Sequence, residues 1–272
     1  MHPFRRSNSL PANEIPRRNH KYFCALIHCA ACGLIAATTW AGPETGEKVT
    51  SPLSQWLAGD GMTGNWDGMR SALVAEHGVK IFGSYMAEVW GNTVGGLKQG
   101  ALYTGLLGFG ADVDLEKLIG WKGASIHNNW FWLSGQDASA DLVGNFLTIS
   151  GIAGFDTLRM DELWFQQSLL DDRISIRFGQ IRADTEFVIS EAGALFLNTT
   201  LGFPALLYTN LPDGGPVYPM GTLGIRLAFT PVKAFTFQTA IFEGNKFAQN
   251  VNRYGFRYSL NPEFGYFWIL RP

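Results

Sequence analysis

The sequence predicts an all-β fold, an antiparallel transmembrane β-barrel preceded by a short N-terminal helix. Three observations predict it. Side chains alternate between apolar and polar over segments of ten residues or more, close to the 9–11 residues of a tilted membrane-crossing strand. The composition is unusual for a soluble domain, because aromatic residues make up 14% and charged residues only 16% of the 272 residues. A pattern typical of an export signal precedes these segments.

The first 41 residues have the pattern of a secretory signal. Five basic residues between Arg5 and Lys21 precede an apolar stretch over 22–37, and Thr39-Trp40-Ala41 then fits the small-x-small cleavage rule. A membrane anchor is the alternative, but the apolar stretch is short of the roughly 20 residues that a spanning helix needs. The expected organisation is a signal peptide over 1–41, an N-terminal periplasmic segment with a short helix over 42–78, and a barrel domain over 79–272.

Thiol and histidine chemistry is restricted by where these residues lie. Cys24, Cys29 and Cys32 all fall inside the leader, so the exported chain would have no disulfide, thiolate metal site or cysteine nucleophile. His77 and His127 are the only histidines after the leader, so a histidine metal site would need carboxylates to complete it. We expect no metal and no cofactor. The net charge of −2 argues against nucleic acid as a partner, since such proteins are basic.

Alternation with a period of two is clearest in the first two strand segments. In the segment 79–90, Lys80 and Glu88 lie on one face and the odd-numbered residues form the other. In the segment 103–115, Asp112 and Asp114 lie opposite a face of aliphatic and aromatic residues. This is the pattern of a strand with two different environments, and it does not fit a helical stripe.

The same pattern continues along the chain. Further strand segments are expected at 124–133, 158–169, 173–181, 222–230 and 234–242, and residues 256–260 suggest one more. Asp171-Asp172 reads as a tight hairpin turn, although the faces of the strand before it are ambiguous because Arg159 and Asp161 share a face with Leu163. We count roughly eight strands, joined alternately by short turns and longer Gly-rich stretches. Soluble sandwiches and ligand-binding barrels also alternate, with the apolar face inward.

Two segments do not alternate. Residues 65–78 read as a short helix, with Trp66, Met69 and Leu73 at helical spacing and Gly78 as terminator. Residues 187–220 form a long connection rich in glycine and proline. A connection of that length is usually functional, and in a barrel it could fold inward and narrow the lumen.

Four strings of residues carry a family resemblance. They are GNWDGMRSALVAEHGV, GGLKQGALYTGLLGFGADVDLEKLIGWKGA, ELWFQQSLLDDRISIRFGQIRADTEF and NTTLGFPALLYTNLPDGGPVYPMGTLGIRL. Over about 64–244 the chain thereby resembles the carbohydrate-selective porin family, OprB type. The resemblance implies an outer-membrane barrel of sixteen strands that passes sugars, with charged lumen residues and an inward loop. Sixteen strands need on the order of 300 residues or more, so we expect a truncated chain, a partial barrel of roughly 8–10 strands.

The candidate pore-lining and sugar-binding residues are the charges on polar strand faces and around the long loop. Guanidinium and carboxylate groups suit the paired hydroxyls of a sugar. The candidates are Lys80, Glu88, Asp112, Asp114, Arg177, Arg182, Asp184, Glu186, Glu191 and Arg226.

An enzyme is not expected. Ser125 and His127 share a strand face but have no third orienting group, and Asp171-Asp172 is explained by turn chemistry. The aromatic run 130–132 fits an interfacial girdle better than a sugar platform.

The expected function is diffusion of mono- or oligosaccharides across the outer membrane of a Gram-negative bacterium. Carbohydrate solutes and outer-membrane lipid are the expected partners, and a homo-oligomer is left open. The alternative is an exported soluble β-barrel protein that binds a sugar or a lipid.

Overall fold

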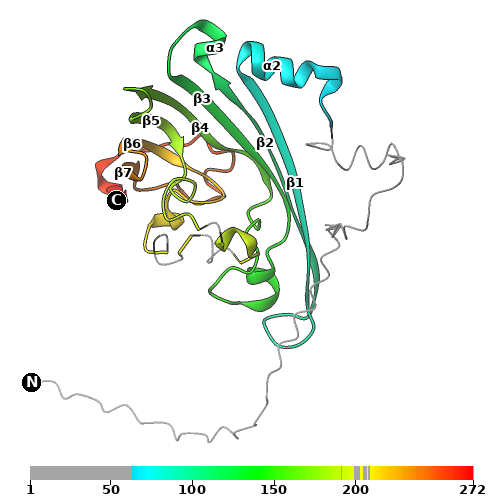
Figure 1. Ribbon diagram of the computed structural model, residues 1–272. Coiled ribbons are helices and arrows are strands. Elements are labelled where there is room, and N and C mark those ends of the chain that lie inside the picture. Colours follow the sequence, from blue (N-terminus) through cyan, green and yellow to red (C-terminus); the bar gives the residue numbers. More distant parts are fainter. Residues whose placement is uncertain (1–62, 191, 199–202, 205–206, 208, 272) are drawn as a thin grey trace, which may run out of the picture.

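The computed structural model describes residues 63–271, apart from 191, 199–202, 205–206 and 208 (Figure 1). The expected signal peptide over 1–41, most of the expected periplasmic segment and the candidate Glu191 therefore lie outside the described residues. A short helix, α2 (Met69–His77), precedes the first strand and ends at Gly78, whose φ of 67° is the left-handed conformation that terminates helices. The expected N-terminal helix is confirmed.

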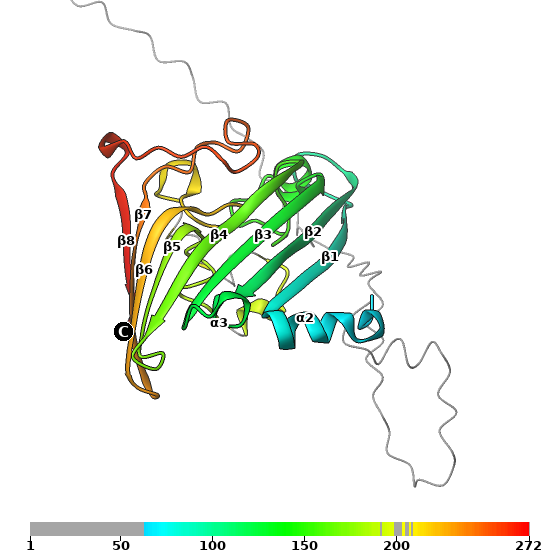
Figure 2. The ribbon, with the colours of Figure 1, turned by 90° about the horizontal axis from the view of Figure 1, so that it is seen from above.

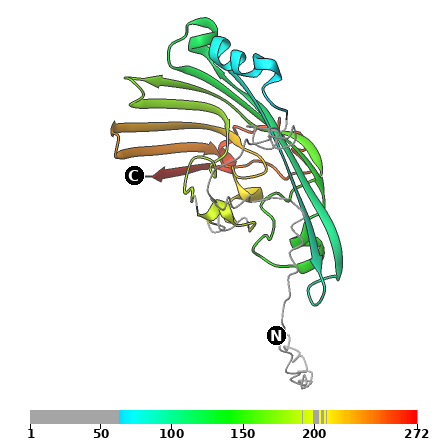
Figure 3. The same ribbon diagram turned by 45° about the vertical axis from the view of Figure 1, so that its right-hand side comes forward.

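The rest of the described chain is dominated by one antiparallel sheet, in which each strand pairs with its neighbour in sequence. The sheet is curved but not closed, with the first and last described strands as its two edges (Figures 1 and 3). Its strands are β1 (Val79–Asn92), β2 (Gly100–Asp114), β3 (Ala124–Gly135), β4 (Thr157–Leu169), β5 (Ile174–Ile181), β6 (Thr222–Val232), β7 (Phe235–Glu243) and β8 (Tyr266–Arg271).

The two ends of the sheet differ in their connections. At one end lie tight turns at 170–173 and 233–234 and the short helix α3 (Leu115–Ile119). At the other end lie the longer loops 93–99, 136–156, 182–221 and 244–265 (Figure 2). Leu170, Asp171 and Asp172 all have positive φ in the β4–β5 turn, so the predicted hairpin is confirmed. The asymmetry matches that of outer-membrane barrels, which have short periplasmic turns and long outer loops.

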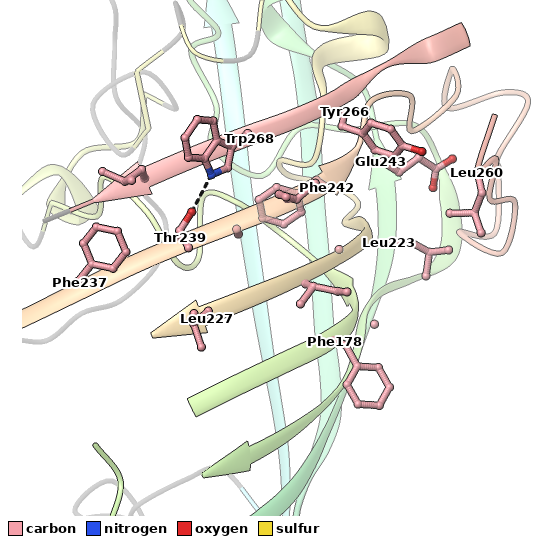
Figure 4. A pocket seen from close by; sticks show the side chains of 16 residues that line it. Phe178, Leu223, Leu227, Phe237, Thr239, Phe242, Glu243, Leu260, Tyr266 and Trp268 are labelled. Atoms are coloured by element: carbon pink, nitrogen blue, oxygen red, sulfur yellow. Dashed lines mark hydrogen bonds between the residues drawn. The ribbon is translucent and has the colours of Figure 1, made fainter. Parts of the chain in front are cut away.

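The convex outer face of the sheet is apolar. Tyr85, Phe109, Ile176, Leu227 and Ile225 all point outward and are 37–61% exposed. On β5 to β8 this face includes a groove of about 800 Å³, with Trp268 donating from Nε1 to Thr239 Oγ1 at 2.7 Å along its wall (Figure 4). Such a face suits hydrocarbon and would be unfavourable in water over so large an area.

The concave inner face carries polar side chains and packs against loops. The β5–β6 loop folds back into the concavity (Figure 1), where Ala183 and Phe187 are fully buried against Ile181 and Phe242. The β3–β4 loop also packs inward, and its Ile152 joins a buried cluster with wall residues. The β5–β6 loop thus already turns inward at Ala183, before the segment 187–220 for which an inward loop is expected.

A β-bulge explains the ambiguous faces of β4. Asn129 pairs with Glu162 while the next residue, Trp130, pairs with Met160, so Asp161 is the extra residue. A bulge shifts the alternation by one position, and this puts Asp161 and Glu162 on the same side. On β4 the inward-facing residues are therefore odd-numbered before the bulge and even-numbered after it. A strict period of two does not predict this change.

The segment expected as a strand at 256–260 forms no strand, and this prediction is wrong. It lies within the β7–β8 loop, which runs back across the sheet to the upper part of β4 (Figure 2). There the Met160 amide donates to the Tyr254 carbonyl at 3.0 Å, and Tyr258 Oη donates to Gln180 Oε1 at 2.6 Å. Because β5 is only eight residues long, the loop takes the place of a missing strand extension beside β4.

Candidate functional site

A cluster of two arginines and one glutamate lies at the centre of the inner face. Arg177 on β5 and Arg226 on β6 are direct cross-strand neighbours. Like charges placed this way repel, and Glu186 from the inward loop lies between them. Its Oε1 accepts from Arg177 Nη1, and its Oε2 accepts from Arg226 Nε at 3.1 Å. Gln238 Nε2 also donates to Oε2, at 2.8 Å, so the carboxylate is held from three strands.

Neighbouring amide and hydroxyl groups complete this cluster. Gln166 Oε1 on β4 accepts from both guanidinium groups, at 2.8 Å from Arg177 Nη2 and 2.9 Å from Arg226 Nη2. Ser175 accepts from Arg226 Nη1. Hydrogen bonds join five residues, which we call the arginine cluster: Gln166, Arg177, Glu186, Arg226 and Gln238. The cluster is a fixed array of donors and acceptors at the wall of the concavity.

A stack of aromatic rings supports Arg177 on the side toward β1. The guanidinium carbon of Arg177 lies 3.5 Å from the ring centroid of Trp164, a cation–π contact. His127 stacks on Trp164 at 4.8 Å and on Phe82 at 5.6 Å. Nδ1 of His127 is 2.6 Å from Asp112 Oδ1, which fixes the imidazole. Arg177 is thereby held from both sides, by rings and by Glu186.

A second charged group lies nearer the long-loop end. Arg182 forms ion pairs with Asp161 Oδ2 at 3.0 Å and with Asp184 Oδ1 at 2.9 Å. Its amide donates to Glu162 Oε1 at 3.0 Å. Burial disfavours the charge on Arg182, but the two paired carboxylates outweigh it and raise the pKa of this guanidinium above its ordinary value. The bulge makes this arrangement possible, because it places two adjacent acids on the inner side.

The remaining candidates have other surroundings. Lys80 is exposed on the inner face, opposite Asp112 in the β1–β2 register. Glu88 Oε2 accepts from Trp90 Nε1 at 2.9 Å and from Ser150 Oγ at 2.6 Å, and so fastens the β3–β4 loop to the wall. Asp114 caps helix α3, accepting from the amides of residues 116 and 117. Its role is structural, at the short-turn end.

The structure thus brings six candidates into two groups. Arg177, Glu186 and Arg226 form one, and Arg182 and Asp184 belong to the other, while Asp112 supports the first group through His127. The aromatic run 130–132 does not act as a unit. Trp132 is 55% exposed on the outer face, as a girdle residue would be, whereas Phe131 is buried on the inner side against Tyr218.

Five residues of the site escape the sequence reasoning: Gln238 on β7 and, on β4, Arg159, Asp161, Glu162 and Gln166. Arg159 is completely buried, and its Nη2 donates to the Asn252 carbonyl at 2.9 Å. The Nε and Nη1 atoms of Arg159 and Oδ1 of Asp161 have no hydrogen-bond partner within the described residues. The signal was the mixed face of 158–169, where charged residues coincide with apolar ones. A period break of that kind marks a bulge.

The described residues include no cluster of side chains suited to a metal ion. None of the helices in the described part is long and apolar enough to cross a membrane. The inner face offers hydrogen-bond donors and acceptors in fixed positions, which suits recognition of hydroxyl groups.

Known proteins are similar to this chain in sequence and architecture. The family model described as "Carbohydrate-selective porin, OprB family" matches residues 98–270. Porin B of Pseudomonas aeruginosa is 30% identical over 146 residues, which cover 50% of this chain and 31% of that protein. The high-pH structure of Pseudomonas putida OprB superposes with a TM-score of 0.64 at 26% identity, covering 74% of this chain and 49% of that one.

The chain therefore spans about a third of the curated relative and about half of the solved one. The family match covers more than half of the chain and includes seven of the eight strands in full or nearly so. The arginine cluster and most of the outward apolar face fall within it, whereas β1 lies outside. The chain belongs to the carbohydrate-selective porin family, OprB type.

Proposed function

We propose that this chain forms part of the wall of an outer-membrane pore through which sugars diffuse. The observation that carries the proposal is the opposition of the two sheet faces: hydrocarbon-like side chains outside and a fixed charged array inside. A soluble ligand-binding barrel needs the reverse arrangement, with its apolar face sealed inside. Family membership supports the same assignment, and the export pattern of the first 41 residues fits it.

The apolar outer face defines the surface that contacts lipid. The lengths of the connections define which end of the sheet faces the periplasm. Large apolar side chains on β5 to β8 stand in the hydrocarbon, and the short turns face the periplasm, as in other outer-membrane barrels. The long loops then face the outside of the cell. A solute entering from there meets the Arg182 group first and the arginine cluster next.

The arginine cluster would select for hydroxylated solutes. Guanidinium N–H groups and the oxygens of Glu186 and Gln166 offer donors and acceptors side by side, which matches adjacent sugar hydroxyls. The protein groups already satisfy one another, so a passing sugar exchanges hydrogen bonds and leaves again. Weak binding of this kind at several points permits diffusion, since a tightly held solute would block the path.

Liposome swelling tests the proposal. Vesicles that contain the purified chain should swell in iso-osmotic D-glucose faster than protein-free vesicles, and more slowly in a trisaccharide. Arg226→Gln should change the ratio of the glucose rate to the rate for a similarly sized amino acid. Arg173→Gln, in the exposed β4–β5 turn, is the matched control and should leave that ratio unchanged. Circular dichroism and heat-modifiable gel mobility check that each variant is folded.

Two results would overturn the proposal. One is a folded chain that stays soluble without detergent, which would contradict the lipid-facing outer wall. The other is a membrane-inserted chain whose vesicles are no more permeable to glucose than empty ones.

A further inference from the structure

A separate cavity, lined by apolar side chains and several charged ones, lies at the long-loop end, beyond the arginine cluster. Its volume is about 600 Å³, within the range of small-molecule sites. Three loops line it: β3–β4, β5–β6 and β7–β8. Asp184 lines this cavity, and Glu186, two residues further along the same loop, bridges Arg177 and Arg226. The cavity, called here the outer cavity, therefore adjoins the candidate solute path on the side where solutes would enter.

Lys246 is the most unusual residue of the outer cavity. It is only 4% exposed, and it lines the cavity together with Asp184 and Asp213. Burying an ammonium group is costly, so buried lysines are rare unless other groups compensate their charge. Burial, and to a lesser extent the Arg159 guanidinium, lower the pKa of Lys246 to about 8. At neutral pH the group still carries its proton and remains a strong donor.

Acceptors and an apolar surface lie around this donor. Asp184 accepts from Arg182 and from the Tyr218 amide at 3.2 Å, which leaves lone pairs for a further donor because a carboxylate has about four acceptor positions. Asp213 is exposed at the rim. The ring of Phe155 is 38% exposed on the opposite loop.

We propose that the outer cavity captures one neutral monosaccharide or polyol before it enters the pore. In this site Lys246 donates to a hydroxyl, Asp184 and Asp213 accept from hydroxyls, and the Phe155 ring covers a C–H face of the sugar. Three aspartates line the cavity against one lysine, and this disfavours an anionic sugar. The inference rests on the proposed function, because it takes the sugar to enter from the long-loop side.

Calorimetric titration of the full chain in detergent micelles with D-glucose tests the site without requiring conduction. Lys246→Met should weaken glucose binding by about tenfold or more, the effect of losing a hydrogen bond to a charged group. The same variant should unfold at equal or higher denaturant concentration, because a buried charge has been removed. A residue with only a structural role would not lower affinity while it raises stability.

Two matched controls and a second variant sharpen the test. Lys233→Met removes a lysine from the exposed β6–β7 turn, and Phe146→Ala removes an exposed ring from the β3–β4 loop outside the cavity. Both should bind glucose normally. Phe155→Ala should weaken binding several-fold, and because its ring is exposed the fold should persist even if Lys246→Met misfolds.

The outcomes separate this inference from the proposed function. Unchanged glucose affinity in both cavity variants, or no glucose binding by the unmodified chain, would overturn the site. Gluconate bound as tightly as glucose would overturn the neutral class of ligand. Glucose binding that depends on Lys246 in a chain that gives no vesicle swelling would leave the site standing and refute the pore.

Discussion

The two faces of the sheet are built from the same strands and obey different rules. On the outer face, side chains need only to be apolar, and no ion pair of the described residues lies there. On the inner face, Arg177, Glu186 and Arg226 come from two strands and a loop, and each depends on the position of the others. Outer positions should therefore accept any apolar residue, whereas inner positions should be sensitive to small chemical changes.

The largest expected effect comes from putting a charge on the wrong face. Ile225→Arg places a guanidinium in hydrocarbon and should lower the free energy of unfolding in lipid vesicles by about 2–4 kcal/mol. Ser84→Arg, an exposed inward position on β1, is the control and should change it by less than about 0.5 kcal/mol. Guanidinium unfolding measures the free energy of unfolding of both variants. Equal losses would contradict the expected difference between the outer and inner faces.

The free energy of unfolding measured against pH tests the effect of the buried lysine in the outer cavity. The pKa of Lys246 is lowered to about 8 in the folded chain and returns to its ordinary value of 10.5 on unfolding. Between these values the unfolded chain binds more protons, so stability rises with pH, by at most about 3 kcal/mol in total. Lys246→Met should abolish this rise. If the Lys246→Met variant still shows the full rise of stability with pH, another titratable group causes that rise.

Glu186→Gln tests the dependence among inner residues. The substitution keeps the shape but leaves two facing guanidinium groups without their shared negative charge, so stability should fall by about 1–3 kcal/mol. In planar bilayers the current should shift toward anions. Glu116→Gln, on helix α3 at the short-turn end, is the control of equal charge change. A cation preference identical in both variants would show that the arginine cluster does not face the solute path.

Asp114 should have the smallest effect, because it serves a local role. Asp114→Ala removes the side chain that accepts from two amides of α3 and should cost about 1 kcal/mol. Its reversal potential and glucose permeability should match those of the unmodified chain. A change in either would return Asp114 to the pore-lining residues.

Most of the fold could be predicted from period-two alternation. That pattern placed β1 to β7 and the hairpin at Asp171-Asp172, because one face meets hydrocarbon and the other meets polar groups over the whole strand. It failed where the wall is not regular. Residues 256–260 look like a strand because Phe256 and Tyr258 are spaced two apart, but their backbone lies in a loop that runs back to β4.

Alternation predicts which residues of a regular strand face inward, but it does not predict which of those residues contact one another. Alternation placed Arg177 and Arg226 on the inner face, yet their contact depends on the β5–β6 register, which no local pattern fixes. Asp161 and Glu162 were missed because a bulge hides them, and Lys246 because it lies in a loop without periodicity. Each of these depends on tertiary placement.

The sharing of Glu186 has an evolutionary consequence. Two cations and one anion leave the arginine cluster with a surplus positive charge, and that surplus is set by a single carboxylate. One codon change at this position could retune which nutrients a descendant admits, with the surrounding scaffold left intact. Diversification of diet would then require little remodelling of the wall.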